Sequence, residues 1–233
     1  MTRTAPVLRA RDIAIGYGDE TVLDGVDLAL DAGCCLAVVG ANGCGKSTLM
    51  RVLVGRQEPD RGEVEFLGAP PRETSAGFRR EAAVLLDGAE CFPDLTVREH
   101  VRMVAVAHGL GRRADGASRA VLNTIGLDRR ADAFPDTLSA GQRQMLLLAA
   151  ALVRPARLIV ADEPEQRLDA RSRERLASAL RTAKENGAAV LLACHDPELV
   201  DALADEVLVL DAGKAAAYGA AAEVRGHQAV PWA

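Results

Sequence analysis

The sequence lacks the usual marks of a secreted, membrane-spanning or polyanion-binding protein. Its five cysteines form no Cys-x-x-Cys pair and their number is odd, which disfavours a disulfide or metal framework and fits a reducing cytosol. No secretory signal is visible at the N-terminus, and the apolar run at 145–153 is far too short to cross a membrane. A net charge of −5 gives no support for a nucleic-acid surface. We therefore expect a cytoplasmic protein without a nucleic-acid partner, which would need another chain to act across a membrane.

The overall composition is that of an ordinary globular protein. Of the 233 residues, 49% are hydrophobic and 26% are charged, as in folded domains generally. This length suits one large α/β domain or two small ones, with a sizeable core. Composition alone does not indicate a function, so the function must be inferred from sequence motifs.

The clearest motif is a glycine-rich segment at residues 40–48. Gly40, Gly45, Lys46 and Ser47 fit the spacing G-x-x-x-x-G-K-[ST] of a phosphate-binding loop. An apolar run at 35–39 precedes it as a buried strand, and a helical pattern follows at 48–54. Glycines let backbone N–H groups face an anion, Lys46 adds charge near the β- and γ-phosphates, and the Ser47 hydroxyl can ligate Mg²⁺. The alternative is a loop that merely turns the chain.

The candidate nucleotide-binding residues of this segment are Gly40, Ala41, Asn42, Gly43, Cys44, Gly45, Lys46, Ser47 and Thr48.

Residue patterns along the chain predict alternating strands and helices. Period-two alternation indicates strands at 13–17 and 26–30, which we expect to be antiparallel, and another at 62–68. Thr96 and Glu99 have capping-box spacing, so a helix should run from there to about His108. Further helices are expected at 117–125, 144–152, 171–185 and after Asp196-Pro197. Further strands are expected at 81–86, 158–161, 189–193 and 206–210, the last being the final core strand. The mostly helical middle third therefore resembles an insertion into an α/β core.

Polar residues directly follow four of the apolar strands. Gly40, Asp87, Asp162-Glu163 and His195 occupy these positions, and ligands bind at the carboxyl ends of parallel strands. Asp162 suits a carboxylate that helps to hold Mg²⁺, and Glu163 is placed to polarise an attacking water. His195 would face the terminal phosphate. The alternatives are an acidic pair that caps a turn and a histidine with a surface or packing role.

Residues 138–142 read Leu-Ser-Ala-Gly-Gln and lead into a predicted helix. The loop N–H groups and the Ser139 hydroxyl could bind an anion, whereas an ordinary helix N-cap would explain Ser139 alone. This string resembles the L-S-G-G-Q signature of the ATP-binding cassette (ABC) transporter family, with Ala140 in place of a glycine. The signature, the Asp162-Glu163 segment and the histidine occur in the family's order. The resemblance covers about residues 7–219.

The resemblance implies an α/β fold of the P-loop NTPase (RecA-like) class. It would have a mostly parallel sheet core, an N-terminal antiparallel β subdomain and an inserted helical subdomain. The chain would be a single ABC ATPase domain, 1–233. Its core and β subdomain would span about 1–88 and 154–233, and its helical subdomain about 89–153.

The resemblance also assigns roles to individual residues. Glu163 would be the catalytic carboxylate and His195 the switch histidine. Tyr17 resembles the aromatic residue that stacks on adenine, with a packing tyrosine as the alternative. Leu168-Asp169 resembles the D-loop that crosses to a second subunit. The Mg²⁺ ligands would be Ser47, Asp162 and Asp87. The residues that contact ATP on the opposite subunit would be Ser139, Ala140, Gly141 and Gln142.

The implied assembly is a homodimer or heterodimer of ATPase subunits. It would bind ATP and Mg²⁺ and drive a transmembrane permease from the cytoplasmic face of the membrane. Residues 92–99 resemble exporter-type members. The permease contacts would lie near residues 87–97.

Three positions depart from the family pattern. Asp87 replaces a usual glutamine, with Glu90 as the other candidate for that alignment. Glu165-Gln166 are bulky where the family has a small polar residue after Pro164, and Arg167 replaces a glycine. These changes would affect dimer geometry or the hydrolysis rate.

Two rival functions are a soluble ABC ATPase, such as an iron–sulfur assembly scaffold, and a P-loop GTPase or kinase. The second lacks support because the sequence has no N-K-x-D guanine motif.

Overall fold

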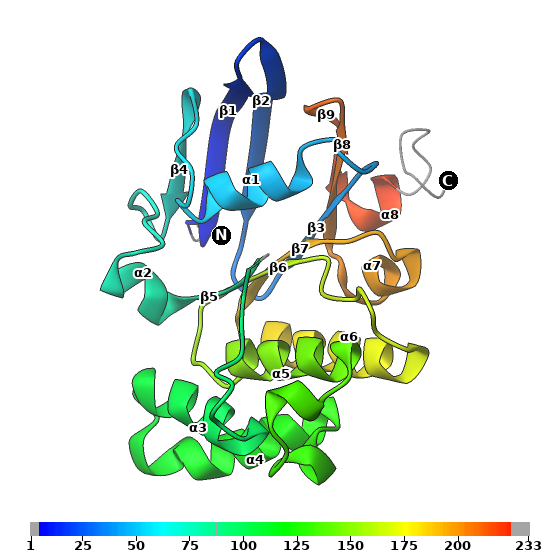
Figure 1. Cartoon of the computed structure of the whole chain (residues 1–233). Coiled ribbons are helices and arrows are strands. Elements are labelled where there is room, and N and C mark those ends of the chain that lie inside the picture. The colour runs from blue at the N-terminus through cyan, green and yellow to red at the C-terminus, as the bar shows by residue number, and fades with distance from the viewer. Residues whose placement is uncertain (1–4, 87, 225–233) are drawn as a thin grey trace.

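The computed structural model describes residues 5–86 and 88–224 and contains two β-sheets (Figure 1). The smaller sheet has the strand order β2-β1-β4 and is antiparallel. Its strands are β1 (Leu8–Tyr17), β2 (Glu20–Leu30) and β4 (Arg61–Phe66). The predictions of antiparallel strands near the N-terminus and of a strand at 62–68 are therefore confirmed.

The larger sheet has the strand order β5-β6-β7-β3-β8-β9 and is parallel except at β9. Its strands are β3 (Cys35–Val39), β5 (Ala82–Leu85), β6 (Leu158–Asp162), β7 (Ala189–Ala193), β8 (Glu206–Asp211) and β9 (Lys214–Ala220). The strand predicted at 206–210 is confirmed as the buried strand β8, but it is not the last strand of the sheet, because the mostly exposed strand β9 follows it. The chain turns back at Gly213, which has φ +78, and β9 pairs antiparallel to β8. Its alanine-rich sequence shows little alternation, so the pattern gave no strand signal there.

Side chains of the larger sheet enter two separate cores. Along β3, Leu36 and Val38 join a core with β1, β2 and helix α1 (Lys46–Leu53), whereas Cys35, Ala37 and Val39 join a core with the helices on the other face. In a strand, successive side chains point to opposite faces. A strand buried on both faces is therefore apolar throughout, as the run at 35–39 is.

Helices cover the second face of the larger sheet. Helices α5 (Ala140–Leu152) and α6 (Ala170–Glu185) lie side by side there, and α3 (Val97–Ala107) and α4 (Ala114–Ile125) pack on them away from the sheet (Figure 1). The remaining elements are α2 (Ala76–Glu81), α7 (Pro197–Leu203), α8 (Ala221–Val224) and short 3-10 turns at Gly111–Arg113, Asp128–Arg130 and Pro135–Thr137. The P-loop NTPase fold class is confirmed, while the subdomain boundaries at about 89 and 153 stay predictions.

Several predicted boundaries shift for local reasons. The Thr96–Glu99 capping box forms as expected and starts α3. Helix α5 starts at Ala140 instead of 144, because Ser139 and Gln142 make a second capping box. Helix α4 starts at Ala114 instead of 117. Residue Glu81 ends α2, a helix that the sequence pattern did not predict, and the strand follows it.

None of the helices in the described part of the chain has the length and hydrophobicity that a membrane span requires.

Candidate functional site

The phosphate-binding loop connects β3 to α1 and is held in a tight shape by its neighbours. Gly45 has φ +107, and a Cβ there would lie 2.9 Å from the Val22 carbonyl oxygen. A Cβ at Gly40 would lie 2.2 Å from the Leu210 carbonyl oxygen and 2.6 Å from the Cys44 sulfur. All three distances are shorter than van der Waals contact, so glycine is required at position 40 and at position 45.

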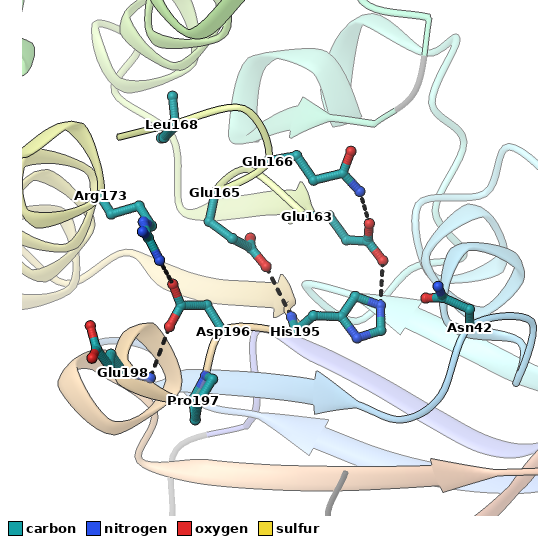
Figure 2. Close-up of a pocket in the computed structure, with 10 residues that line it drawn as sticks. All are labelled: Asn42, Glu163, Glu165, Gln166, Leu168, Arg173, His195, Asp196, Pro197 and Glu198. Atoms are coloured by element: carbon teal, nitrogen blue, oxygen red, sulfur yellow. Dashed lines mark hydrogen bonds and ion pairs between the residues drawn. The ribbon is translucent and has the colours of Figure 1, made fainter. Parts of the chain in front are cut away.

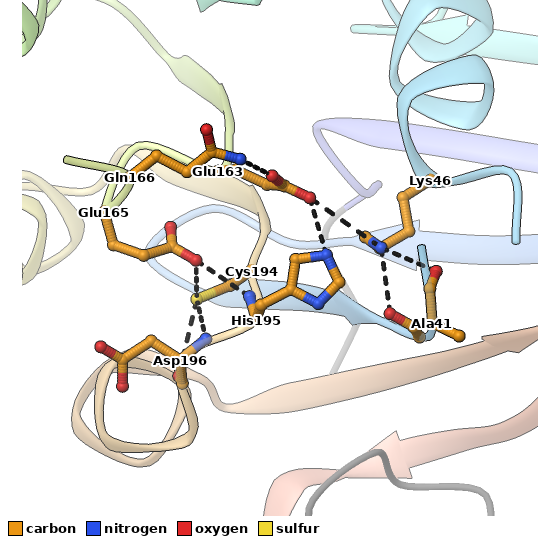
Figure 3. Close-up of polar contacts among 9 residues, drawn as sticks. Ala41, Lys46, Glu163, Glu165, Gln166, Cys194, His195 and Asp196 are labelled. Atoms are coloured by element: carbon orange, nitrogen blue, oxygen red, sulfur yellow. Dashed lines mark hydrogen bonds and ion pairs between the residues drawn. The ribbon is translucent and has the colours of Figure 1, made fainter. Parts of the chain in front are cut away.

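Lys46 is the first residue of α1, and only 5% of its surface is exposed. Its ammonium donates hydrogen bonds to the carbonyl oxygens of Gly40 (3.0 Å) and Ala41 (3.1 Å). The same nitrogen lies 4.0 Å from Oε1 of Glu163 (Figure 3). A buried ammonium needs such partners. The loop therefore presents a held positive charge beside a helix N-terminus, which fits a nucleotide phosphate.

Glu163 and His195 meet at the ends of β6 and β7. His195 Nε2 lies 2.7 Å from Oε1 of Glu163 (Figure 2). The Glu163 N–H donates to the Ala193 carbonyl oxygen at 2.9 Å, which extends the ladder between the two strands. Glu163 itself has φ +46, a left-handed conformation that turns the chain out of the strand. Of the four strand ends predicted to converge, those at Gly40, Asp162-Glu163 and His195 come together, since Lys46 bonds the Gly40 carbonyl and faces Glu163; the fourth, Asp87, lies outside the described residues.

Ser47 and Asp162 line one cavity of about 290 Å³, together with Glu163, Gln144, Gln166 and Arg167. Hydroxyl and carboxylate oxygens are ligands that Mg²⁺ prefers. The two residues therefore fit a magnesium site beside the phosphate loop. Asp87, the third predicted ligand, lies outside the described residues. Glu90, its alternative, lines another cavity, of about 540 Å³, with Cys91, Pro93, Pro135 and Arg143 among its neighbours.

The signature residues build the start of α5. The Ser139 hydroxyl accepts a hydrogen bond from the Gln142 N–H at 3.2 Å, and the Gln142 side chain accepts one from the Ser139 N–H at 3.1 Å. A Cβ at Gly141 would lie 2.7 Å from the Arg167 carbonyl oxygen. Within residues 5–86 and 88–224, no hydrogen bond or ion pair joins residues 139–142 to Lys46, Glu163 or His195. The structure therefore shows the predicted helix cap and leaves the contact with a second subunit as a prediction.

Tyr17 and Asp169 have local partners of their own. Tyr17 is 52% exposed, which disfavours a packing role, and its hydroxyl lies 2.6 Å from the Gln57 amide nitrogen. Stacking on adenine stays a prediction. Asp169 caps α6 by accepting from the Ser172 N–H at 2.7 Å, and this hydrogen bonding lowers the pKa of Asp169. Its D-loop role also stays a prediction.

The cysteines carry no bond to one another, and all five are free thiols. In the phosphate loop, burial raises the pKa of the Cys44 thiol. The protonated thiol packs beside Gly40, as a small filler residue would.

Two contacts at this site were missed by sequence reasoning. The Gln166 side-chain amide donates to Oε2 of Glu163, and Oε1 of Glu165 accepts from the His195 N–H at 2.9 Å. Both residues lie in the segment after Pro164 that departs from the family pattern. That departure was the only signal in the sequence.

Comparison with known proteins decides the family. The sequence model described as "ABC transporter" matches residues 23–166, more than half of the chain. The chain belongs to the ABC transporter family. As an ABC ATPase it is the ATP-binding subunit of a transporter and hydrolyses ATP in a cycle coupled to transport. A P-loop GTPase or kinase is therefore excluded.

Curated relatives of this ABC ATPase are named as import proteins. It is 38% identical over 208 residues to the aliphatic sulfonates import ATP-binding protein SsuB 2 of Xanthomonas axonopodis pv. citri, covering 89% of this chain and 68% of that protein. It is 37% identical to SsuB 1 of Burkholderia lata, covering 86% of this chain and 60% of that one. The exporter resemblance of residues 92–99 is therefore not supported by these relatives.

Solved structures share the fold. An ATP-binding subunit of an ABC transporter superposes with a TM-score of 0.85 at 29% identity, covering 94% of this chain and 92% of that one. The dimeric ABC transporter cassette MJ0796 superposes with a TM-score of 0.81 at 23% identity, covering 91% and 98%. The second likeness supports the fold alone.

The close approach at Gly40 yields a testable prediction. In Gly40→Ala the new methyl overlaps a backbone oxygen, which costs about 1–3 kcal/mol of stability and pushes the loop carbonyls away from Lys46. We expect ATP affinity, measured by calorimetry, to fall at least about tenfold. The control is Gly116→Ala in α4, where a Cβ meets nothing within 4 Å. Wild-type ATP affinity in Gly40→Ala would contradict the tight-loop account.

Proposed function

We propose that this chain is the ATP-hydrolysing subunit of an importer for aliphatic sulfonates, acting with a transmembrane permease at the cytoplasmic face of the membrane. The observation that supports ATP hydrolysis is the position of the Glu163 carboxylate. It lies 2.7 Å from His195 Nε2 and 4.0 Å from Lys46 Nζ. A carboxylate between a phosphate-binding lysine and a histidine is placed to accept a proton from an attacking water.

The residues of this chain divide the work of hydrolysis. Lys46 and the N–H groups of the loop bind the phosphates, and Ser47 and Asp162 hold Mg²⁺. When bound, Mg²⁺ neutralises charge that develops on the phosphate oxygens. Glu163 takes the proton of the water, and His195 donates from its ring to the terminal phosphate. Tyr17 stacks on the adenine.

The signature acts on a second ATPase subunit in this proposal. Ser139 and Gly141 lie at the N-terminus of α5, where the N–H groups of the first turn and the helix dipole favour an anion. Among the described residues, no hydrogen bond or ion pair joins them to Lys46, Glu163 or His195 of their own subunit. A head-to-tail pair would place each signature on the γ-phosphate of the other subunit, and Asp169 would lie at the crossing between the two.

The permease docks beside residues 89–93. The 540 Å³ cavity is lined here by Ala89, Glu90, Cys91 and Pro93, and Phe92, which is not part of the lining, is 54% exposed. The Phe92 ring lies 5.7 Å from the imidazole of His100, and the Phe92 N–H donates to His100 Nδ1 at 3.4 Å. Burial lowers the pKa of His100, so the ring stays neutral and can accept that bond. An exposed aromatic held in this way suits contact with an apolar segment of a partner.

The import direction and substrate class rest on the relatives named above. These relatives also disfavour a soluble ABC ATPase such as an iron–sulfur scaffold. The sulfonate itself would be recognised by the permease and its partners.

Hydrolysis is tested by Glu163→Gln, which keeps the shape of the side chain and removes its basicity. We expect ATP turnover to fall at least about a hundredfold, with ATP affinity retained because Lys46 is intact. The measurement is steady-state phosphate release, and the control is Glu185→Gln at the exposed far end of α6. Unchanged turnover in Glu163→Gln would remove Glu163 from the role of base.

Import is tested by growth of the source organism without this gene. The deletion strain should fail to grow with an alkanesulfonate as its only sulfur source and should grow normally on sulfate. The wild-type gene should restore growth, whereas Glu163→Gln should not. Phe92→Asp should hydrolyse ATP as a purified chain yet fail to restore growth, because it loses the permease contact. Normal growth of the deletion strain on alkanesulfonates would refute this substrate class.

A further inference from the structure

The loop that joins β6 to α6 folds back on the strand end through two successive turns. The Gln166 N–H donates to the Glu163 carbonyl oxygen at 3.1 Å, and the Leu168 N–H donates to the Glu165 carbonyl oxygen at 3.2 Å. Arg167 completes the turn in the left-handed region at φ +65. A residue other than glycine is strained in this conformation. This loop shape brings the side chains of Glu165 and Gln166 back to the site.

Gln166 contacts Oε2 of Glu163, the carboxylate oxygen that neither His195 nor Lys46 faces. Its side-chain amide donates to Oε2, whereas His195 Nε2 and Lys46 Nζ both face Oε1 (Figure 3). The carboxylate is therefore held from both oxygens, which fixes its rotation about the last side-chain bond. A small side chain at this position would be too short to reach Oε2.

Glu165 lies behind His195 and holds its main chain. The Glu165 residue is only 9% exposed, and Oε1 accepts from the His195 N–H at 2.9 Å and contacts Cys194 Sγ at 3.1 Å (Figure 3). Burial and the nearby Glu165 carboxylate raise the pKa of the Cys194 thiol, so the thiol stays protonated and can donate. Charged acceptors make the stronger hydrogen bonds.

We propose that Glu165 and Gln166 are positioning residues that set the geometry between the base Glu163 and the histidine His195. The inference rests on the proposed function, because it assumes the roles of those two residues. Gln166 fixes the carboxylate and Glu165 fixes the backbone from which the imidazole projects. The departure from the family pattern after Pro164 thus supplies two contacts that small residues would lack.

A positioning role for Glu165 and Gln166 predicts a specific effect of their substitution on the kinetics of ATP hydrolysis. Proton transfer depends steeply on geometry, whereas ATP binding depends on Lys46 and the loop. Loss of either contact should therefore lower kcat and leave KM for ATP unchanged. A merely structural role would instead lower the fraction of folded protein and leave the kcat of the folded fraction intact.

The test uses the full chain with ATP and Mg²⁺ and measures kcat and KM. Gln166→Met keeps length and removes the donor, so kcat should fall about tenfold with KM within twofold of wild type. Glu165→Leu removes the acceptor and should give a similar or larger loss of kcat. Glu165→Gln retains Oε1 as an acceptor and should recover kcat to within about threefold of wild type. The matched control is Glu185→Met on the exposed far end of α6, with wild-type kinetics expected.

The outcomes separate this inference from the proposed function. A wild-type or raised kcat in Gln166→Met, with Glu163→Gln inactive, overturns the positioning role and leaves the role of Glu163 intact. Normal turnover in Glu163→Gln overturns the proposed function itself. If Glu165→Leu fails to fold, the other two variants decide. A tenfold loss of kcat in Gln166→Met together with a kcat within about threefold of wild type in Glu165→Gln supports the proposal. Any other combination contradicts it.

Discussion

The burial of one positive charge constrains the whole site. Lys46 is 5% exposed, and an ammonium removed from water must find compensating partners. The carbonyls of Gly40 and Ala41 and the Glu163 carboxylate supply them. This arrangement requires glycine at the close contact with Leu210 and requires β6, β7 and β3 to be neighbours in the sheet. These carbonyl and carboxylate groups, which compensate the charge of Lys46, would be rearranged by a bound phosphate.

Much of the fold and part of the site follow from local sequence patterns. The buried strand at 35–39, the phosphate loop and the Thr96–Glu99 capping box are each specified by residues close in sequence, so they were predictable. The meeting of the segments at Gly40, Glu163 and His195 followed from one rule on parallel strand ends. Strand β9 was not predictable, because its alanine-rich segment has no alternation and forms only by pairing with β8.

The contacts of Glu165 and Gln166 escaped sequence reasoning for a physical reason. They depend on left-handed backbone at Glu163 and Arg167, conformations that are uncommon outside glycine. Because neither residue is a glycine, the sequence did not predict the turn that brings the side chains of Glu165 and Gln166 to the site. The exporter expectation is not supported by the relatives, and the reason is a different one. Transport direction belongs to another chain, and a short resemblance at 92–99 carried little information about it.

In the proposed assembly, two subunits complete each ATP site. The signature at the start of α5 caps its own helix, and within the described residues no hydrogen bond or ion pair joins it to Lys46, Glu163 or His195. The most direct measurement is the mass in solution of Glu163→Gln with and without ATP, by analytical ultracentrifugation. We expect a single chain without ATP and twice that mass with ATP. A chain that binds ATP and stays at the mass of one copy at every protein concentration would contradict the account.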